Sequence, residues 1–214
     1  MTKTNFLNYI KEVNFNISPY ADDYLVLIQC NEVELLNLAG GIPQDEPFTI
    51  LLSAEYDFDA NSIYFSSESS FFFNERLLFW NDKFIDNYYL SVFSQGRGVG
   101  TFILINQIIQ ARKLGLRSLK VSAARSEQFN GFYTWARLGY SIDSPDDQEE
   151  FDQLILEHGR SERSLQELMQ SNSGRDFWKQ YGFWWQGQFD LNPNSENIMA
   201  LNKYLNQAGI NILL

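Results

Sequence analysis

The residues whose types and spacing are best suited to chemistry form a glycine-rich turn between two apolar segments. The turn consists of Gln95, Gly96, Arg97, Gly98, Val99 and Gly100. Glycine lets a backbone approach a ligand without a side-chain clash. If a helix begins here, its first N–H groups and its dipole favour an anion, and Arg97 adds a positive charge. The turn therefore predicts a site for a phosphate or pyrophosphate group.

The spacing of the glycines excludes two common phosphate-binding motifs. No Gly-Lys-Ser/Thr follows the turn, so it is not a Walker loop. Gly96, Gly98 and Gly100 are evenly spaced by two, whereas the dinucleotide fingerprint requires Gly-x-Gly-x-x-Gly. On these grounds alone the identity of the phosphate ligand stays open.

The segments on either side must hold this turn in place. Residues 88–93 and 119–123 have strand-like patterns, and residues 98–114 have the periodicity of a helix. The expected apolar face of that helix consists of Val99, Phe102, Ile103, Ile105, Ile109 and Leu114, with Asn106, Gln110 and Lys113 opposite. Gly115 is placed to cap its C-terminus. Strand, glycine turn, helix and strand together predict a βαβ unit.

With these elements in order, the sequence resembles the GNAT superfamily of acyl-CoA-dependent N-acyltransferases, whose acyl-CoA loop reads Arg/Gln-x-x-Gly-x-Gly/Ala. Residues 95–100 fit every position of that loop. Residues 130–140 are similar to the family's second signature, and the resemblance covers about residues 86–142. It implies a single GNAT domain over residues 1–214, of the α/β (α+β) class, with a mixed, mostly antiparallel sheet flanked by helices.

The resemblance also implies a reaction. An acyl group would move from acyl-CoA, either acetyl-CoA or a longer one, to an amine of a small molecule or peptide by direct attack in a ternary complex. Backbone amides of residues 95–100 would bind the pyrophosphate, and Asn130 would hydrogen-bond the pantetheine arm. A backbone amide near Val92 or Phe93 would polarise the thioester carbonyl. Positioning alone would supply most of the acceleration.

The sequence departs from the family's pattern at the general acid. The family's usual tyrosine position holds Trp135, which has no useful proton to give. Tyr133, two residues earlier, is the alternative acid, or else a packed aromatic residue. Glu55 and Glu68, near the ends of expected strands, are the candidate bases, or else solvated carboxylates.

Charge is distributed unevenly along the chain. Residues 87–126 contain six Lys and Arg and no Asp or Glu. Because the whole chain carries −11, the remainder carries −17. The basic segment favours a confined anionic ligand or, equally, a helix end that complements its own dipole. The overall negative charge argues against nucleic acid as a partner.

Composition limits the other kinds of chemistry. Cys30 is the only cysteine and His158 the only histidine, which excludes disulfides and zinc sites built from several such ligands. We expect no metal cofactor, a buried and inert Cys30, and a surface His158. No apolar run reaches the roughly 20 residues that span a bilayer, and no secretory signal is recognised, so a cytoplasmic protein without a membrane span is expected.

Aromatic residues make up 16% of the chain and gather at residues 71–73, 79–80 and 183–185. They are interpreted as core or as a homodimer patch, or alternatively as the lining of a pocket for a long acyl chain. A long-chain donor could be an acyl-carrier protein, whose acidic surface would suit the basic segment. Trp135, at the position of the family's usual general acid, also suggests a second class of function. In that class the protein is a non-catalytic module that binds CoA or a protein.

The remaining pattern completes the expected fold. Strands are predicted over residues 24–30, 48–56 and 62–66, while residues 69–80 are ambiguous. Helices are predicted over residues 2–13, 31–38 and 195–207, and a polar helical insertion over about 143–172. The insertion begins at Ser144-Pro145, a cap followed by proline at the first helical position.

Overall fold

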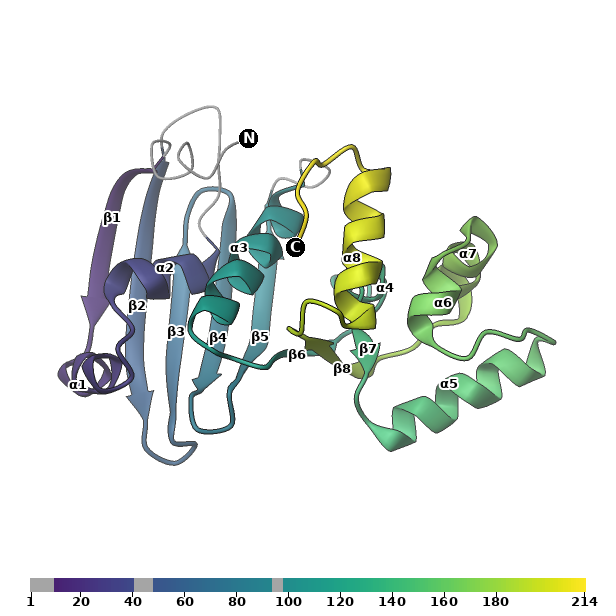
Figure 1. Ribbon diagram of the computed structural model, residues 1–214, viewed down its shortest axis with the longest axis horizontal. Helices are drawn as coiled ribbons and strands as arrows, with labels where there is room; N and C mark the ends of the chain where they lie inside the picture. The colour runs from purple at the N-terminus through teal and green to yellow at the C-terminus, as the bar shows by residue number, and fades with distance from the viewer. Residues whose placement is uncertain (1–9, 41–47, 94–97) are drawn as a thin grey trace. The chain divides into compact units, whose positions relative to one another are not determined.

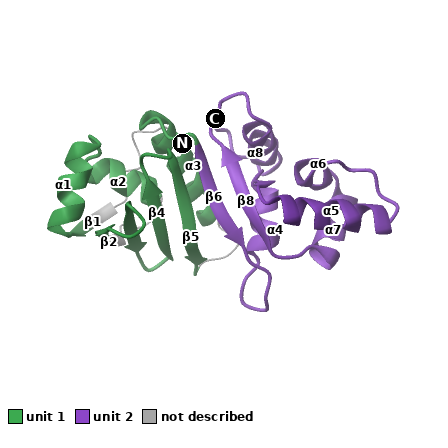
Figure 2. Ribbon diagram, turned by 90° about the horizontal axis from the view of Figure 1, so that it is seen from below, with its two compact units in different colours: residues 1–117 green, residues 118–214 purple. Residues whose placement is uncertain are grey.

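The computed structural model describes residues 10–40, 48–93 and 98–214. The chain divides into two compact units, residues 1–117 and residues 118–214, coloured separately in Figure 2. Each unit is described by itself below.

Unit 1 is a five-stranded sheet with its three helices on one face (Figure 1). Its elements are β1 (Ile10–Ile17), α1 (Pro19–Leu27), α2 (Glu32–Ala39), β2 (Phe48–Asp57), β3 (Ser62–Glu68), β4 (Phe72–Phe79), β5 (Phe84–Val92) and α3 (Val99–Lys113). Within the unit the strand order is β1-β2-β3-β4-β5, with β1 parallel to β2 and the later neighbours antiparallel.

Alternating burial explains the strands of this sheet. On β4 the even-numbered residues from Phe72 to Leu78 are buried beneath the helices, and the odd-numbered ones are half-buried on the opposite face. The strands predicted over residues 48–56 and 62–66 are confirmed, and the ambiguous residues 69–80 contain β4. The turn between β2 and β3 is fixed by the Asp57 carboxylate, which accepts the N–H groups of Asp59 and Ala60 at 3.0 Å each.

Two predictions near the N-terminus are wrong. The helix expected over residues 2–13 is contradicted in its described part, because Ile10–Ile17 is the strand β1. Its residues 2–9 lie outside the described residues. β1 obtains its backbone partners from β2, a non-local pairing that a local apolar spacing does not reveal.

The strand expected over residues 24–30 is also wrong, because α1 and the turn after it occupy this segment. Ser18 caps the helix by accepting a hydrogen bond from the Ala21 N–H, and Pro19 is the first residue of the helix. Val26 and Leu27 are 72% and 75% exposed, since a helix turns only one side toward the sheet. The start signal at Ser18-Pro19 outweighs the β-branched composition.

The helices at the centre of unit 1 are confirmed. α2 begins with a capping box between Asn31 and Glu34 and ends at Gly40, whose φ is +83°. α3 matches the predicted helix, and its end is followed by Gly115 with φ +74°. Gln110, however, is predicted on the polar face and is buried in the structure. The buried surface of α3 is wider than the single apolar face that the sequence predicts.

Two buried polar side chains of β4 hold the C-terminal end of α2. The Arg76 guanidinium is 2% exposed and donates to the Leu38 carbonyl, and the Asn74 amide donates to the Ala39 carbonyl at 2.9 Å. A cation at the negative end of a helix dipole is favourable, and the last carbonyls of a helix lack partners within it. These bonds fasten α2 to the centre of the sheet.

Unit 2 combines three strands with five helices. Its elements are β6 (Ser118–Ala123), α4 (Gly131–Arg137), β7 (Ser141–Ile142), α5 (Pro145–Glu157), α6 (Leu165–Met169), α7 (Asn172–Tyr181), β8 (Trp185–Asp190) and α8 (Glu196–Gln207). β8 lies between β6 and β7 and is antiparallel to both. The predicted strand over 119–123, the helical character of residues 143–172 and the final helix are confirmed.

The core of unit 2 is organised by two indole rings. Trp178 of α7 and Trp185 of β8 are fully buried, and both N–H groups donate to the Phe132 carbonyl of α4, at 3.0 and 3.1 Å. Gly182 ends α7 between them, where a Cβ would meet Trp178. One carbonyl oxygen therefore joins three elements of the unit.

At the level of fold class the prediction is confirmed. The protein is mixed α and β, and of the strand pairs described within the two units only β1 and β2 run parallel. Among the described residues there is no helix with the length and hydropathy needed to cross a bilayer.

Cys30 is expected to react slowly with thiol reagents in the folded protein. Burial, and then the nearby Glu34 carboxylate, raise the pKa of its thiol to about 12 from an ordinary 9.0, and the thiolate is the nucleophile. Because the folded protein holds this proton more tightly, the thiol's contribution to stability is complete below about pH 9 and is lost as the pH rises toward about 12. Reaction rates with and without denaturant check this; equal rates would contradict it.

Candidate functional site

The junction of β5 and α3 is the best-defined part of the candidate site. Residues 95–97 lie outside the described residues, so the predicted roles of Gln95, Gly96 and Arg97 are not described further. Gly98 is the N-cap of α3, with φ +73° and no side-chain hydrogen bond to the helix. Because the N-cap residue is a glycine, it has no side chain with which to cap the first backbone N–H groups of α3.

The two described glycines of the turn differ in what requires them. Gly98 has a left-handed conformation that other residues rarely adopt. Gly100 has no such constraint, and among the described residues a Cβ added there would meet only the Val92 side chain, at an ordinary 3.7 Å. Because the fold does not need a glycine at position 100, its small size suits the approach of another molecule.

The hydrogen-bond ladder separates the two amides predicted to polarise a carbonyl. The Phe93 N–H donates to the Phe71 carbonyl at 2.8 Å, so it is already used. Val92, the residue before Phe93, stands opposite Phe72 of β4. Since alternate residues of an antiparallel strand bond to alternate sides, the Val92 N–H is directed away from β4. Of the two, Val92 is therefore the amide that β4 does not use.

A buried amide pair fastens β5 to α3. The Asn87 and Gln107 side chains exchange two hydrogen bonds, at 3.1 and 2.8 Å. Asn87 lies where the register of β4 and β5 shifts between Glu75 and Leu77, a bulge that sequence reasoning missed. The pair joins the middle of β5 to the middle of α3. Its only signal in the sequence is one polar residue within each apolar pattern.

The register of the sheet separates the two candidate bases. Glu55 stands opposite Tyr64, and Glu68 opposite Leu51, so they lie four residues apart along β2, roughly 13 Å. Both side chains are exposed on the face away from the helices. Glu68 is also opposite Phe73, whose other neighbour is Ser91 of β5. Glu68 is therefore at the end of the sheet where β5 enters the turn, and Glu55 is not.

A third carboxylate on this face, Glu75, is held by a tyrosine. The Tyr64 hydroxyl donates to Glu75 at 2.5 Å. Burial, and then the bond to Glu75, raise the pKa of Tyr64 to about 12, so the phenol keeps its proton. Sequence reasoning missed this pair, because it depends on the register of β3 against β4.

The remaining candidates belong to unit 2. Asn130 is the exposed N-cap residue of α4, and its side chain does not cap the helix. Tyr133 lies one turn of the helix later, half-buried, with the Lys179 ammonium 5.0 Å from the centre of its ring. Trp135 packs edge-on against Tyr140, with ring centres 5.1 Å apart. Trp135 is thus part of the packing, and Tyr133 is the residue of this helix whose hydroxyl could serve as an acid.

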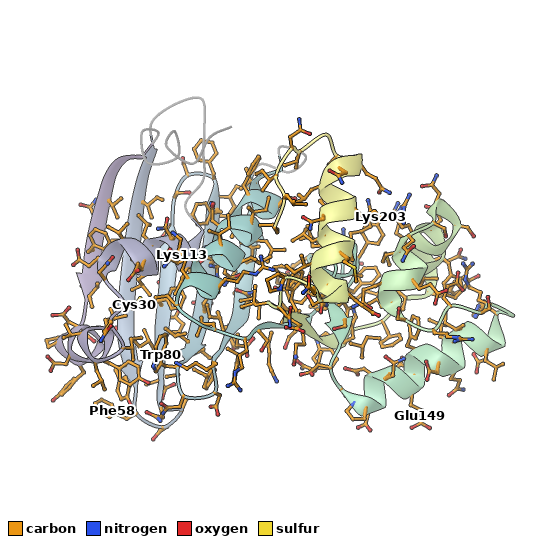
Figure 3. The ribbon with its side chains drawn as sticks, in the orientation of Figure 1. Cys30, Phe58, Trp80, Lys113, Glu149 and Lys203 are labelled. Carbon is orange, nitrogen blue, oxygen red and sulfur yellow. The ribbon has the colours of Figure 1, made fainter. Side chains whose placement is uncertain are left out.

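Most of the aromatic clusters are part of the packing. Phe72 and Trp185 are fully buried, and Phe79 stacks on Phe84 with ring centres 4.5 Å apart. Trp80 and Phe58, labelled in Figure 3, lie in the β4–β5 and β2–β3 turns, at the opposite end of the sheet from Val92. Phe72 and Trp185 support the interpretation of the clusters as core, whereas Trp184 and Phe58 are exposed.

Comparisons with protein-family models, with curated proteins and with solved structures found no match.

Proposed function

We propose that this protein is an N-acyltransferase of the GNAT type, which transfers an acyl group from acyl-CoA to an amine. The observation that carries the proposal is the start of α3: a strand ends, and a helix begins at the left-handed Gly98 without a side-chain cap. Gly100 follows where the fold itself requires no glycine. Such a start suits a pyrophosphate, since N–H groups and the helix dipole favour an anion that can come close.

In the proposed reaction the pyrophosphate binds at the start of α3 and the pantetheine arm lies along β5. The Val92 N–H donates to the thioester carbonyl as negative charge develops on its oxygen. The amine nitrogen forms a bond to the carbonyl carbon, and the carbon–sulfur bond breaks. Because strand neighbours are about 5 Å apart, Glu68 lies about 10 Å from β5 and takes the ammonium proton through water.

Two further residues belong to unit 2, and their roles stay predictions from the family resemblance. Asn130 is predicted to hydrogen-bond the pantetheine arm. Tyr133 is predicted to give a proton to the leaving thiolate, because Trp135 has none to give. Water is the alternative acid, in which case transfer rests on positioning.

Trp135 also favours a second candidate function, a GNAT-like module that binds acyl-CoA or a protein without turnover. Its ring is used in packing against Tyr140, so the family's usual acid has no substitute at that position. A further alternative concerns the acyl donor, which would have a long chain and would be carried either by CoA or by an acyl-carrier protein. Acyl transfer measured across a panel of amines distinguishes the two functions, since the module binds CoA but releases no thiol.

Gly100→Ala is the sharpest test of the proposed site. Gly100 is the second residue of α3, where alanine in place of glycine should stabilise the helix by up to about 1 kcal/mol, and among the described residues the added Cβ meets no obstacle. We therefore expect equal or higher thermal stability together with at least about tenfold weaker acetyl-CoA binding, measured by calorimetry.

The matched control is Gly115→Ala at the other end of the same helix. Its φ of +74° makes alanine strained, so this variant should lose stability and keep its affinity for acetyl-CoA. Unchanged acetyl-CoA binding by Gly100→Ala would remove the start of α3 as the cofactor site.

A further inference from the structure

A cleft of about 720 Å³ opens within unit 2 between α4, α6 and α8. This volume is within the range of small-molecule pockets, about 300–1,000 Å³. The lining residues used below are Arg137, Gln166, Met169, Met199, Lys203 and Tyr204. None of these residues has a role in the acyl transfer proposed above.

Arg137 is a half-buried cation of this cleft without a counter-ion. It ends α4, and its guanidinium lies 5.0 Å from the centre of the Tyr204 ring. In the part of the chain that the structure describes, no carboxylate forms an ion pair with it. Burial, and then repulsion by Arg175, lower the pKa of Arg137. An anion bound beside Arg137 would compensate for the burial of its charge and for the repulsion by Arg175.

Gln166 supplies an independent observation beside it. Its side chain is only 8% exposed, yet it forms no hydrogen bond with any residue of the described ranges. Buried amides in proteins are nearly always hydrogen-bonded. Gln166 is among the residues that line the cleft, so a ligand in the cleft could be a partner for its amide.

The other charges of the cleft leave it favourable to an anion. Lys203, labelled in Figure 3, extends from α8 and donates to Gln170 at 3.1 Å. Of the two lining carboxylates, Glu167 accepts the Arg163 N–H at 2.8 Å, and Glu196 is exposed in the first turn of α8. Neither carboxylate is an ion-pair partner of Arg137 or Lys203 among the described residues.

The cleft also has apolar surface beside its charged and polar groups. Met169 is buried and Met199 is exposed on α8, and the Tyr204 ring is the surface on which Arg137 rests. Flexible thioethers and an aromatic face bind a hydrocarbon or aromatic body without fixing its identity. We propose that this cleft binds a small organic anion, whose carboxylate or phosphate lies against Arg137 and Gln166 and whose apolar body lies against Met199 and Tyr204.

The test measures binding of phenyl phosphate and benzoate to the full chain by NMR. Both probes are expected to shift signals of cleft residues, with dissociation constants on the order of 1 mM or tighter. Comparing the two probes distinguishes a phosphate from a carboxylate ligand. Benzylamine has the same ring and the opposite charge, and it should not bind. Inorganic phosphate lacks the apolar body, and it should bind more weakly than phenyl phosphate.

Two variants make the test specific to the cleft. Arg137→Gln is expected to weaken binding at least about tenfold, since hydrogen bonds to charged groups are the strong ones. Gln166→Met keeps the size of the side chain and removes its amide, so it tests the site even if Arg137→Gln folds poorly, and should weaken binding several-fold. Lys179→Gln, outside the cleft, is the charge-matched control. Failure of both probes to bind, or unchanged binding in the two cleft variants, would overturn the proposal.

Discussion

Replacing Trp178 with alanine is expected to destabilise unit 2 by about 3–5 kcal/mol, a large part of the stability of an ordinary domain. The side chain is fully buried, so its removal leaves a cavity as well as losing apolar contact. It also removes one of the two indole N–H groups that the Phe132 carbonyl accepts. Chemical denaturation followed by circular dichroism measures the change.

Trp184 provides the matched control, because it is the same residue type in the same segment and is 47% exposed. Trp184→Ala should change the free energy of unfolding by less than about 1 kcal/mol. Trp178→Phe separates packing from hydrogen bonding, since Phe132 keeps the bond from Trp185. A Trp178→Ala protein as stable as the Trp184→Ala protein would show that α7 does not belong to the cooperative core of unit 2.

Replacing Arg76 with alanine is expected to destabilise unit 1 by about 3 kcal/mol or more. The change opens a cavity beneath α2 and removes the donor to the Leu38 carbonyl, an acceptor at the end of a helix. Arg76→Met keeps most of the volume, and its expected cost is about 1–3 kcal/mol from the lost hydrogen bonding alone. Urea unfolding gives both values.

Arg117→Ala is the control, since this arginine is exposed and its loss should stay within about 0.5 kcal/mol. An Arg76→Met protein more stable than the original would mean that the cost of burying the guanidinium exceeds what its hydrogen bonds return. In that case the fastening of α2 to the sheet would rest on Asn74.

Elements that begin with strong capping signals could be predicted from the sequence. Asn31 with Glu34, Ser144 with Pro145, and Ser195 each precede a helix, and each caps that helix in the structure. These signals act within one turn of the chain, so sequence alone contains them. The same signal at Ser18 was overlooked in favour of β-branched composition, which is the weaker evidence because strand preference depends on context.

In the candidate site, too, the local features could be predicted from the sequence and the long-range ones could not. The glycine turn was predicted because its chemistry is local, and Gly98 does begin α3. The ranking of Glu68 above Glu55, and of Val92 above Phe93, needed the register of four strands. The Asn87–Gln107 pair and the Arg137 cleft join residues that are distant in sequence, and no spacing rule reaches them.

The central place of β8 in the sheet of unit 2 also constrains how that unit assembles. Ser118 of β6 pairs with Asp190 of β8, 72 positions later in the chain (190 − 118), and β7 pairs with the same strand. A ribosome delivers β6 and β7 well before the strand that lies between them. Closing so long a loop is slow, so this sheet completes late, after the helices of residues 145–181 have formed locally.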